Sequence, residues 1–265
     1  MRKVIPFVCL VLFFLPVSLL ASSIPLAIAE SSVTIVSPGY GMGSGTVIIA
    51  KDNSIWVLTA AHVVAGLKEE SEVIDQKTGA KKTKVSFRDA KVVRHIVENG
   101  RTVGRLELDA EIIRYSPVEN HDLALLKLRR GMFKTSAIFH LDKEIPEIGT
   151  DLYHCGSLLG EFGSNSLTAG IVSKHGRVLN NYTYDQVSCP SFPGSSGGGV
   201  FLKSNGKYIG MVTRGAGETF SLIVPVRRIQ VWSKQVGIEF IVDPSIAIPS
   251  KEDLNKLPIE DNLKE

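Results

Sequence analysis

Short apolar runs, rich in Val, Ile, Thr and Tyr, are separated by Gly, Pro, Asn and Asp between positions 33 and 224. The clearest of these runs are 46–49, 55–58, 111–115, 123–128, 170–173 and 208–212. Residues 51–54 have the composition of a hairpin turn between two of them. Helical spacers of about 10–15 residues, which alternating β/α units require, do not separate the runs. The pattern therefore predicts an all-β protein built as a sandwich or barrels.

The pattern changes after Pro225. Apolar residues recur there at about helical spacing, which predicts a short amphipathic helix over about 226–237. The residues that carry this spacing are Val226, Ile229, Val231, Trp232 and Val236. Beyond residue 242 the chain becomes rich in Pro, Glu and Lys, and we expect 243–265 to be a mobile C-terminal tail.

The N-terminus has the pattern of a secretory signal peptide. Arg2 and Lys3 precede an apolar run over 4–20, and small residues around Ala29 end the segment. We predict that residues 1–29 are a signal peptide, that 30–242 form the folded domain, and that the protein is exported, either secreted or periplasmic. The alternative is an uncleaved segment that anchors the protein to the membrane. No second apolar run is long enough to span a bilayer.

The charge balance bears on nucleic acid as a partner. The 265 residues include 30 Lys and Arg against 27 Asp and Glu, and loss of Arg2 and Lys3 with the signal leaves 28 against 27. This balance gives no reason to expect nucleic-acid binding. A basic cluster over 77–94 is interrupted by acidic residues and is interpreted as a solvated hairpin. The histidines lack metal-ligand spacing, so neither a metal nor another cofactor is expected.

Two cysteines remain after the signal. An exported protein can hold a disulfide between Cys155 and Cys189, or the two thiols can be buried and free. Cys189 precedes a proline and has no His or Lys beside it, which argues against a nucleophilic role.

The segment 193–199 is the strongest candidate for chemistry, because serines stand among glycines there. Glycine permits a tight turn that aims successive backbone N–H groups at one point, as an oxyanion hole requires. A flexible Gly/Ser loop is the alternative, but the apolar run from Val200 favours a turn held by strands.

Two further segments carry candidate catalytic residues. His62 follows the end of an apolar run and suits a general base, although a lone His is more often structural. Asp122 opens the apolar run 123–128, where a buried carboxylate would need a donor such as an imidazole N–H; a turn cap is the alternative. If none of the three segments were catalytic, the structural alternatives for all three would have to hold together by coincidence.

His62, Asp122 and Ser196, in that order, resemble the catalytic residues of the chymotrypsin-like (trypsin-like) serine endopeptidases. The strings TAAHVV, HDLALLKL and GSSGG are similar to that family's three motifs, over about 33–232. The run 43–46 and Pro193 resemble the bacterial HtrA/Deg branch more than digestive trypsins. The resemblance implies two six-stranded antiparallel β-barrels, about 31–130 and 145–225, with the active site in the cleft between them.

The resemblance also implies a role for each residue. Ser196 would attack the scissile carbonyl, His62 would take its proton, and Asp122 would orient the imidazole. The backbone N–H groups of Gly194 and Ser196 would form the oxyanion hole. The glycine pair follows Ser196, which selects it over Ser195 as the nucleophile.

Departures from the family pattern matter as well. Digestive members carry an Asp where this chain has Ser195, so we expect no zymogen switch of that kind. The resemblance places the specificity pocket at Pro190, Phe192, Thr213, Arg214, Gly215 and Ser221, which favours a small or medium apolar P1 residue. Deg proteases commonly continue into a PDZ domain, and we expect none in the short segment after residue 242.

Two hypotheses follow for function. The first is an active, exported serine endopeptidase that acts on proteins or peptides through an acyl-enzyme. The second is a non-catalytic homologue that uses the same fold for binding. The intact set of His62, Asp122 and Ser196 favours the enzyme.

Overall fold

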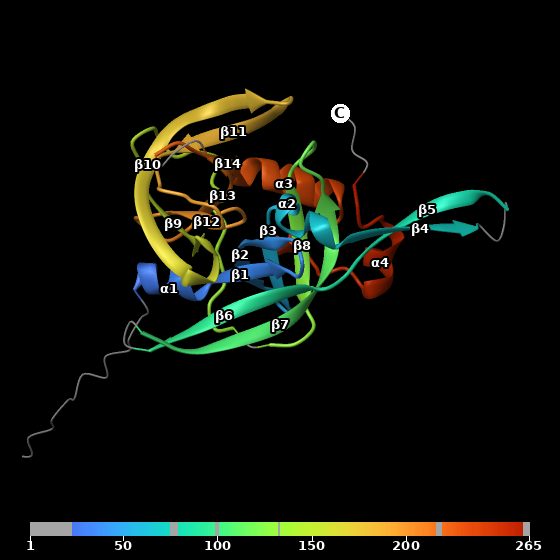
Figure 1. The fold of residues 1–265 in the computed structure, drawn as a ribbon. Helices are drawn as coiled ribbons and strands as arrows, with labels where there is room; N and C mark the ends of the chain where they lie inside the picture. Colours follow the sequence, from blue (N-terminus) through green and yellow to red (C-terminus); the bar gives the residue numbers. More distant parts are fainter. Residues whose placement is uncertain (1–22, 75–78, 99–100, 132, 216–218, 262–265) are drawn as a thin grey trace, which may run out of the picture.

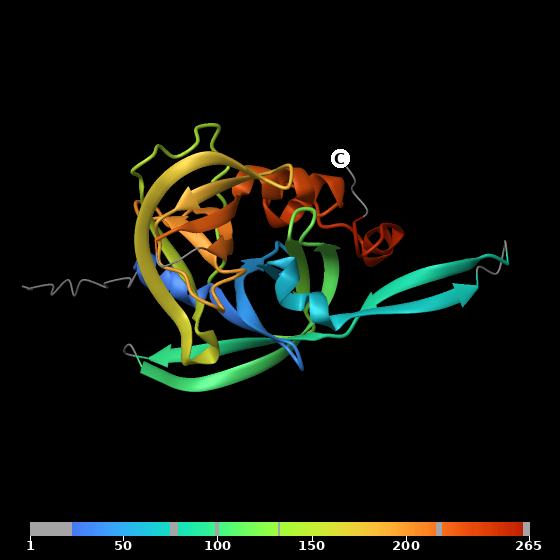
Figure 2. The same cartoon turned by 45° about the horizontal axis from the view of Figure 1, so that its top comes forward.

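The computed structural model describes residues 23–74, 79–98, 101–131, 133–215 and 219–261. They form two closed, antiparallel six-stranded barrels that pack side by side (Figure 1). The second view shows the two barrels side by side as well (Figure 2). The all-β prediction and the two-barrel architecture are confirmed.

The first barrel has the strand order β1-β2-β3-β8-β7-β6. Its strands are β1 (Ser32–Ser37), β2 (Gly41–Ile49), β3 (Ile55–Thr59), β6 (Ala90–Glu98), β7 (Arg101–Ser116) and β8 (Leu123–Leu128). All of β3 and nearly all of β8 are buried, which explains their continuous apolar runs. Trp56 and Leu125 are fully buried in this core. The predicted turn at 51–54 joins β2 to β3, and Asn53 adopts the left-handed φ of 62° there.

The second barrel has the order β10-β11-β14-β13-β12-β9. Its strands are β9 (Asp151–Leu158), β10 (Gly163–Leu179), β11 (Tyr182–Val187), β12 (Gly199–Leu202), β13 (Tyr208–Gly215) and β14 (Ser221–Pro225). A separate apolar cluster fills this barrel and includes Val172, Val200 and Ile223. The loop that precedes β12 carries the glycine-rich segment.

A third sheet projects from the body. Strands β4 (Lys68–Ile74) and β5 (Lys81–Phe87) pair only with each other and extend away from the barrels (Figures 1 and 2). Every described residue of β4 after Lys68 is exposed. Of the basic cluster, Lys81, Lys82 and Lys84 lie on this exposed hairpin. Lys91 and Arg94 lie instead on β6 of the first barrel, and Lys77 lies outside the described residues.

The helices are short. They are α1 (Ile24–Glu30), α2 (Ala61–Val64), α3 (Val226–Gln235) and α4 (Lys251–Lys256), with 3-10 turns at Ala65–Leu67, Gly160–Phe162 and Glu239–Ile241. The helix predicted after Pro225 is present as α3. Ile229 and Trp232 on one face are fully buried, while Val231 is 53% exposed.

The C-terminal segment differs from the mobile tail that we expected. Leu254 on α4 is buried, and Ile246, Ile248 and Ile259 pack partly buried against the main core. These apolar residues are few and lie among Pro, Glu and Lys, so their spacing does not predict that they pack against the core. Residues 243–261 therefore belong to the folded body.

The N-terminal helix α1 also packs on the body. Ile28 is buried in the main core, and the amide of Asn165 on β10 donates to the carbonyl oxygen of Ala29 at 3.0 Å. The apolar run 4–20 lies outside the described residues. Within the described chain, no helix is long and apolar enough to cross a membrane.

Candidate active site

His62 lies in α2, immediately after β3 ends at Thr59. Its side chain is 36% exposed, and its Nδ1 lies 3.1 and 3.0 Å from the two carboxylate oxygens of Asp122. The backbone N–H of His62 donates to Oδ1 of the same carboxylate at 3.1 Å. These contacts direct Nδ1 inward and leave Nε2 as the ring nitrogen available for proton transfer.

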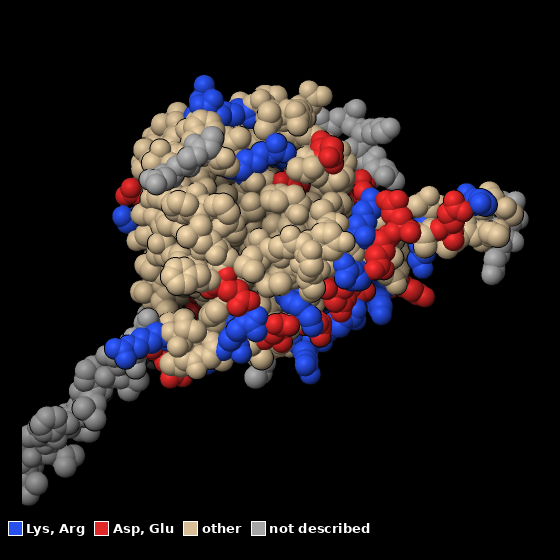
Figure 3. Space-filling view, in the orientation of Figure 1, with Lys and Arg blue, Asp and Glu red and all other residues tan. Residues whose placement is uncertain are grey.

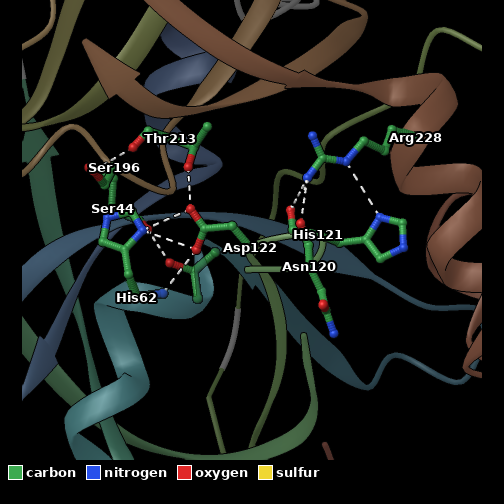
Figure 4. Close-up of polar contacts among 9 residues, drawn as sticks. Ser44, His62, Asn120, His121, Asp122, Ser196, Thr213 and Arg228 are labelled. Carbon is green, nitrogen blue, oxygen red and sulfur yellow. Dashed lines mark hydrogen bonds and ion pairs between the residues drawn. The ribbon is translucent and has the colours of Figure 1, made fainter. Parts of the chain in front are cut away.

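Asp122 stands directly before β8 and is fully buried. It adopts a left-handed φ of 56°, which costs a non-glycine residue about 1–3 kcal/mol. Besides His62, the hydroxyl of Thr213 on β13 donates to Oδ2 of the carboxylate. Figure 4 shows the two donors directed at the carboxylate from opposite barrels. The carboxylate is thus satisfied and held on both sides.

Ser196 lies in the loop before β12, on the second barrel. Its Oγ donates to the carbonyl oxygen of Thr213 at 3.5 Å, the outer limit for a hydrogen bond. Among the described residues, no hydrogen bond joins Ser196 to His62. Catalytic hydrogen bonds are commonly long before substrate binds.

Ser195 lies in a different environment from Ser196. It is 1% exposed, and its Oγ accepts the N–H of Phe192 at 3.1 Å while its own N–H donates to the carbonyl oxygen of Phe192 at 2.9 Å. The side chain therefore closes the turn and faces the interior. Of the two adjacent serines, Ser196 is the more accessible.

The turn before Ser196 orients the backbone amides. The carbonyl oxygen of Pro193 accepts the N–H of Leu159 at 2.8 Å, and a trans peptide directs the Gly194 N–H the opposite way. Gly194 has a φ of 96°, and a Cβ there would stand 2.2 Å from the carbonyl oxygen of Ser157. Within the described chain, neither the Gly194 nor the Ser196 N–H bonds a backbone acceptor. Both are available to a ligand oxygen.

A pocket of about 370 Å³ opens beside Ser196. It is lined by Ser191, Phe192, Pro193, Ser195, Ser196, Val212, Thr213, Arg214 and Gly215. Four of the predicted pocket residues are among these, but Pro190 and Ser221 are not. Ser221 is fully buried behind the wall, where its Oγ contacts Ser191 Oγ at 2.7 Å and donates to the carbonyl oxygen of Cys189 at 3.0 Å.

Comparison with known families decides the classification. The family model described as "Trypsin-like peptidase domain" matches residues 43–211, well over half of the chain. The chain belongs to the trypsin-like peptidases. This is a family of serine endopeptidases, and the order and placement of His62, Asp122 and Ser196 fit it. None of the curated proteins compared matches the chain.

Solved structures of HtrA and Deg proteases share the fold of this peptidase. An inactive serine-to-alanine mutant of Rv3671c from M. tuberculosis H37Rv is 19% identical, with 81% of this chain and 90% of that chain covered and a TM-score of 0.56. Deg5 is 22% identical, with coverages of 83% and 94% and a TM-score of 0.54. The HtrA-type protease AlgW, solved as an alanine variant with a tripeptide, is 22% identical, with coverages of 82% and 64% and a TM-score of 0.56. No PDZ domain is present among the described residues of this peptidase.

Ser44 on β2 links the first barrel of the peptidase to the loop that carries Ser196. Its Oγ donates to the carbonyl oxygen of Gly194 at 2.7 Å and accepts the N–H of Ser157 at 2.7 Å. Its N–H donates to the carbonyl oxygen of Ser196 at 2.7 Å. The motif 43–46 marked this segment in the sequence, but not the bridging role of its serine.

Arg228 on α3 holds the loop that leads to Asp122. Its guanidinium donates to the carbonyl oxygen of His121 at 2.6 Å (Figure 4). The guanidinium also lies 4.5 Å from the ring centroid of Tyr184. Burial, with a smaller effect of the Arg228 charge, lowers the pKa of His121 from 6.5 to about 4. His121 is therefore neutral at physiological pH.

The two cysteines of the peptidase are free and buried, so the structure holds no disulfide between them. Cys155 belongs to the main core cluster, whereas Cys189 belongs to the cluster inside the second barrel. Burial raises the pKa of Cys155 to about 11 and that of Cys189 to about 12, which suppresses the reactive thiolate.

The surface of the peptidase is unevenly charged. Lys, Arg, Asp and Glu gather along the side that carries β4 to β7, whereas the hollowed centre of the view is largely uncharged (Figure 3). Of the pocket-lining residues, only Arg214 is charged.

Proposed function

We propose that the protein hydrolyses peptide bonds through an acyl-enzyme, with Ser196 as nucleophile, His62 as general base and acid, and Asp122 as the group that orients His62. The observation that carries this proposal is the double contact of His62, through Nδ1 and its backbone N–H, with one buried carboxylate. This arrangement holds the ring in the tautomer that leaves Nε2 free to accept a proton.

In the first half of the reaction, the Ser196 hydroxyl rotates toward Nε2 of His62, loses its proton to that nitrogen and attacks the scissile carbonyl carbon. The imidazolium is stabilised by Asp122, which stays ionised. The N–H groups of Gly194 and Ser196 receive the oxyanion. His62 then protonates the leaving amine, and water repeats the sequence on the acyl-enzyme to release the acid and restore Ser196.

Internally quenched peptides test this assignment. Ser196→Ala should lower kcat/KM by about 10⁴-fold or more, without loss of folded structure. Ser204→Ala, at an exposed serine in the turn after β12, is the matched control and should keep full activity. A Ser196→Ala variant as active as wild type would refute the proposal, as would a folded wild-type protein that cleaves no peptide in a diverse library.

The pocket supports a small or medium apolar residue at P1. Its described lining contains no acidic side chain to pair with Lys or Arg, and Arg214 adds a like charge. The hydroxyl pair of Ser191 and Ser221 is already satisfied internally. Peptides that differ only at P1 should therefore be cleaved faster with Ala, Val or Leu than with Lys. Faster cleavage after Lys would contradict this reading of the pocket.

Export remains part of the proposal, on the basis of the N-terminal sequence. The packing of α1 bears on the position of the cut, because cleavage after Ala29 would remove Ile28 from the core. A cut before α1, close to residue 22, would leave that core intact. N-terminal sequencing of the protein from an exporting host distinguishes the two positions, and an uncleaved start at Met1 in the membrane fraction would support the anchored alternative.

A further inference from the structure

The end of the chain contacts the loop that carries Asp122. Residues 259–261 lie alongside the end of β7: the N–H of Tyr115 donates to the carbonyl oxygen of Ile259 at 2.8 Å, and the N–H of Asp261 donates to that of Tyr115 at 3.0 Å. Glu260 between them pairs with Lys68 at 2.7 Å. The segment thus forms a short parallel bridge beside the catalytic loop.

The carboxylate of Asp261 gathers donors from three elements. Nε1 of Trp232 on α3 donates to Oδ2 at 2.8 Å, Nδ2 of Asn120 approaches Oδ1 at 3.4 Å, and the hydroxyl of Ser116 at the end of β7 donates as well. Asp261 is only 6% exposed. Burial, the largest effect, raises its pKa, and the three hydrogen bonds oppose that rise.

Two of these donors, Ser116 and Asn120, belong to the segment that leads to Asp122. Asn120 is two residues before it, and Oγ of Ser116 accepts the N–H of His121 at 3.1 Å. The N–H of Asp122 itself donates to the carbonyl oxygen of Pro117 at 3.1 Å. The loop between β7 and β8 is therefore tied at one end to the Asp261 carboxylate, while Arg228 holds its carbonyl groups from α3.

The left-handed φ of Asp122 explains why such support is needed. A strained residue keeps its conformation only where the surroundings over-determine it. If the loop relaxed, the carboxylate would leave the position in which it accepts both Nδ1 and the backbone N–H of His62. The chain end thus acts on the reactive groups through the backbone of 116–122.

We propose that Asp261 is a positioning residue for catalysis: its carboxylate clamps the loop between β7 and β8 and so holds Asp122 against His62. This inference rests on the proposed peptidase function. It assigns a catalytic consequence to the C-terminal segment, although none of the described side chains of 243–261 hydrogen-bonds to His62, Asp122 or Ser196.

Asp261→Ala tests the clamp. It removes the acceptor of all three donors, so we expect kcat for peptide cleavage to fall at least tenfold with KM changed less than twofold. Asp261→Asn keeps the size of the side chain and an oxygen for Trp232, and we expect its kcat to stay within threefold of wild type. Leu254→Ala is the control, because it weakens the docking of α4 without touching the Asp122 loop. Its kcat should be unchanged.

A double-mutant cycle separates positioning from a general loss of structure. In an Asp122→Asn background, Asp261→Ala should change the residual kcat by less than twofold, because the group that it positions is already gone. An equal loss in both backgrounds, or an unchanged kcat in folded Asp261→Ala, would overturn the proposal.

Hydrogen exchange gives a readout that needs no turnover. A peptide spanning 116–123 should exchange faster in Asp261→Ala than in wild type, and Leu254→Ala should leave its exchange unchanged. Equal protection in Asp261→Ala and wild type would overturn the clamp even if the protein cleaved no substrate. If the 116–123 peptide exchanged faster in Asp261→Ala as expected but the wild-type protein cleaved no peptide, the result would count against the peptidase function and not against the clamp.

Discussion

Replacement of Ser44 by Ala isolates the connection between the first barrel and the nucleophile loop. Ser44 is fully buried, and its hydroxyl makes two hydrogen bonds of 2.7 Å, one to the carbonyl oxygen of Gly194 and one from the N–H of Ser157. The substitution removes only the hydroxyl oxygen. The backbone bond from Ser44 to Ser196 remains.

The expected loss of stability follows from these two bonds. Leaving the buried N–H of Ser157 without an acceptor costs about 1–3 kcal/mol, and losing the bond to Gly194 adds about 0.5–1.5 kcal/mol. We therefore expect Ser44→Ala to lower the free energy of unfolding by about 2–4 kcal/mol. The freed Gly194 carbonyl also loosens the turn that aims the Gly194 N–H, so kcat should fall about tenfold or more.

Urea unfolding followed by tryptophan fluorescence measures the first quantity, and peptide cleavage below the transition measures the second. Ser233→Ala on α3 is the matched control, because its hydroxyl makes a single local bond, to Gln230 at 2.9 Å. That variant should lose no more than about 1.5 kcal/mol and keep its kcat. A Ser44→Ala variant as stable and as active as Ser233→Ala would refute the reasoning.

Three further predictions concern the oxyanion turn, acid stability and specificity. Gly194→Ala should lower kcat by about 10²–10³-fold, because a Cβ 2.2 Å from the Ser157 carbonyl oxygen displaces the N–H donor; wild-type turnover in this variant would contradict the assigned hole. Burial lowers the pKa of His121 and of His154 to about 4, and the Arg228 charge contributes a smaller part of the shift for His121. Because both pKa values lie below the usual 6.5, the contribution of the two neutral rings to the free energy of unfolding is complete above about pH 6.5 and is lost as the pH falls toward 4. Urea midpoints should therefore fall from pH 7 to pH 4.5, and constant midpoints would contradict this account. Arg214→Glu should raise the ratio of kcat/KM for Lys at P1 to that for Leu at P1 by about tenfold, or ~1.4 kcal/mol, in a series of peptides that differ only at P1. An unchanged ratio would show that Arg214 does not contact the P1 residue.

Most of the architecture could be predicted from local patterns. Runs such as those of β3 and β8 are almost entirely buried and form continuous apolar segments. Pro225 marks the point at which β14 ends and α3 begins. The order of His62, Asp122 and Ser196 along the chain pointed to the family, because short motifs around reacting groups keep local spacing.

The contacts that hold the site residues in place could not be predicted from the sequence in the same way. Thr213 was expected in the pocket wall, yet its hydroxyl donates to Asp122, 91 residues away. Asp261 lies in a segment whose polar composition favoured a mobile tail, and its role depends on a groove formed by β7 and α3. Such long-range pairs leave no periodic signal, because each partner looks ordinary within its own segment.

The cysteines show the same limit. The sequence was compatible with a disulfide between Cys155 and Cys189 or with two buried thiols, and spacing along the chain could not separate these alternatives. In the fold, Cys155 lies on β9 and Cys189 follows β11, in different core clusters. Since β9 pairs with β10 and β12 and not with β11, the two thiols stay apart.

Active-site labelling tests the central claim, that Ser196 is the activated nucleophile, most directly. The folded wild-type protein is treated with a fluorophosphonate, digested, and mapped by mass spectrometry across the segment that contains both Ser195 and Ser196. We predict a single adduct on Ser196 that disappears in Ser196→Ala and falls sharply in His62→Ala. An adduct on Ser195, or no adduct on folded wild-type protein, would contradict the account.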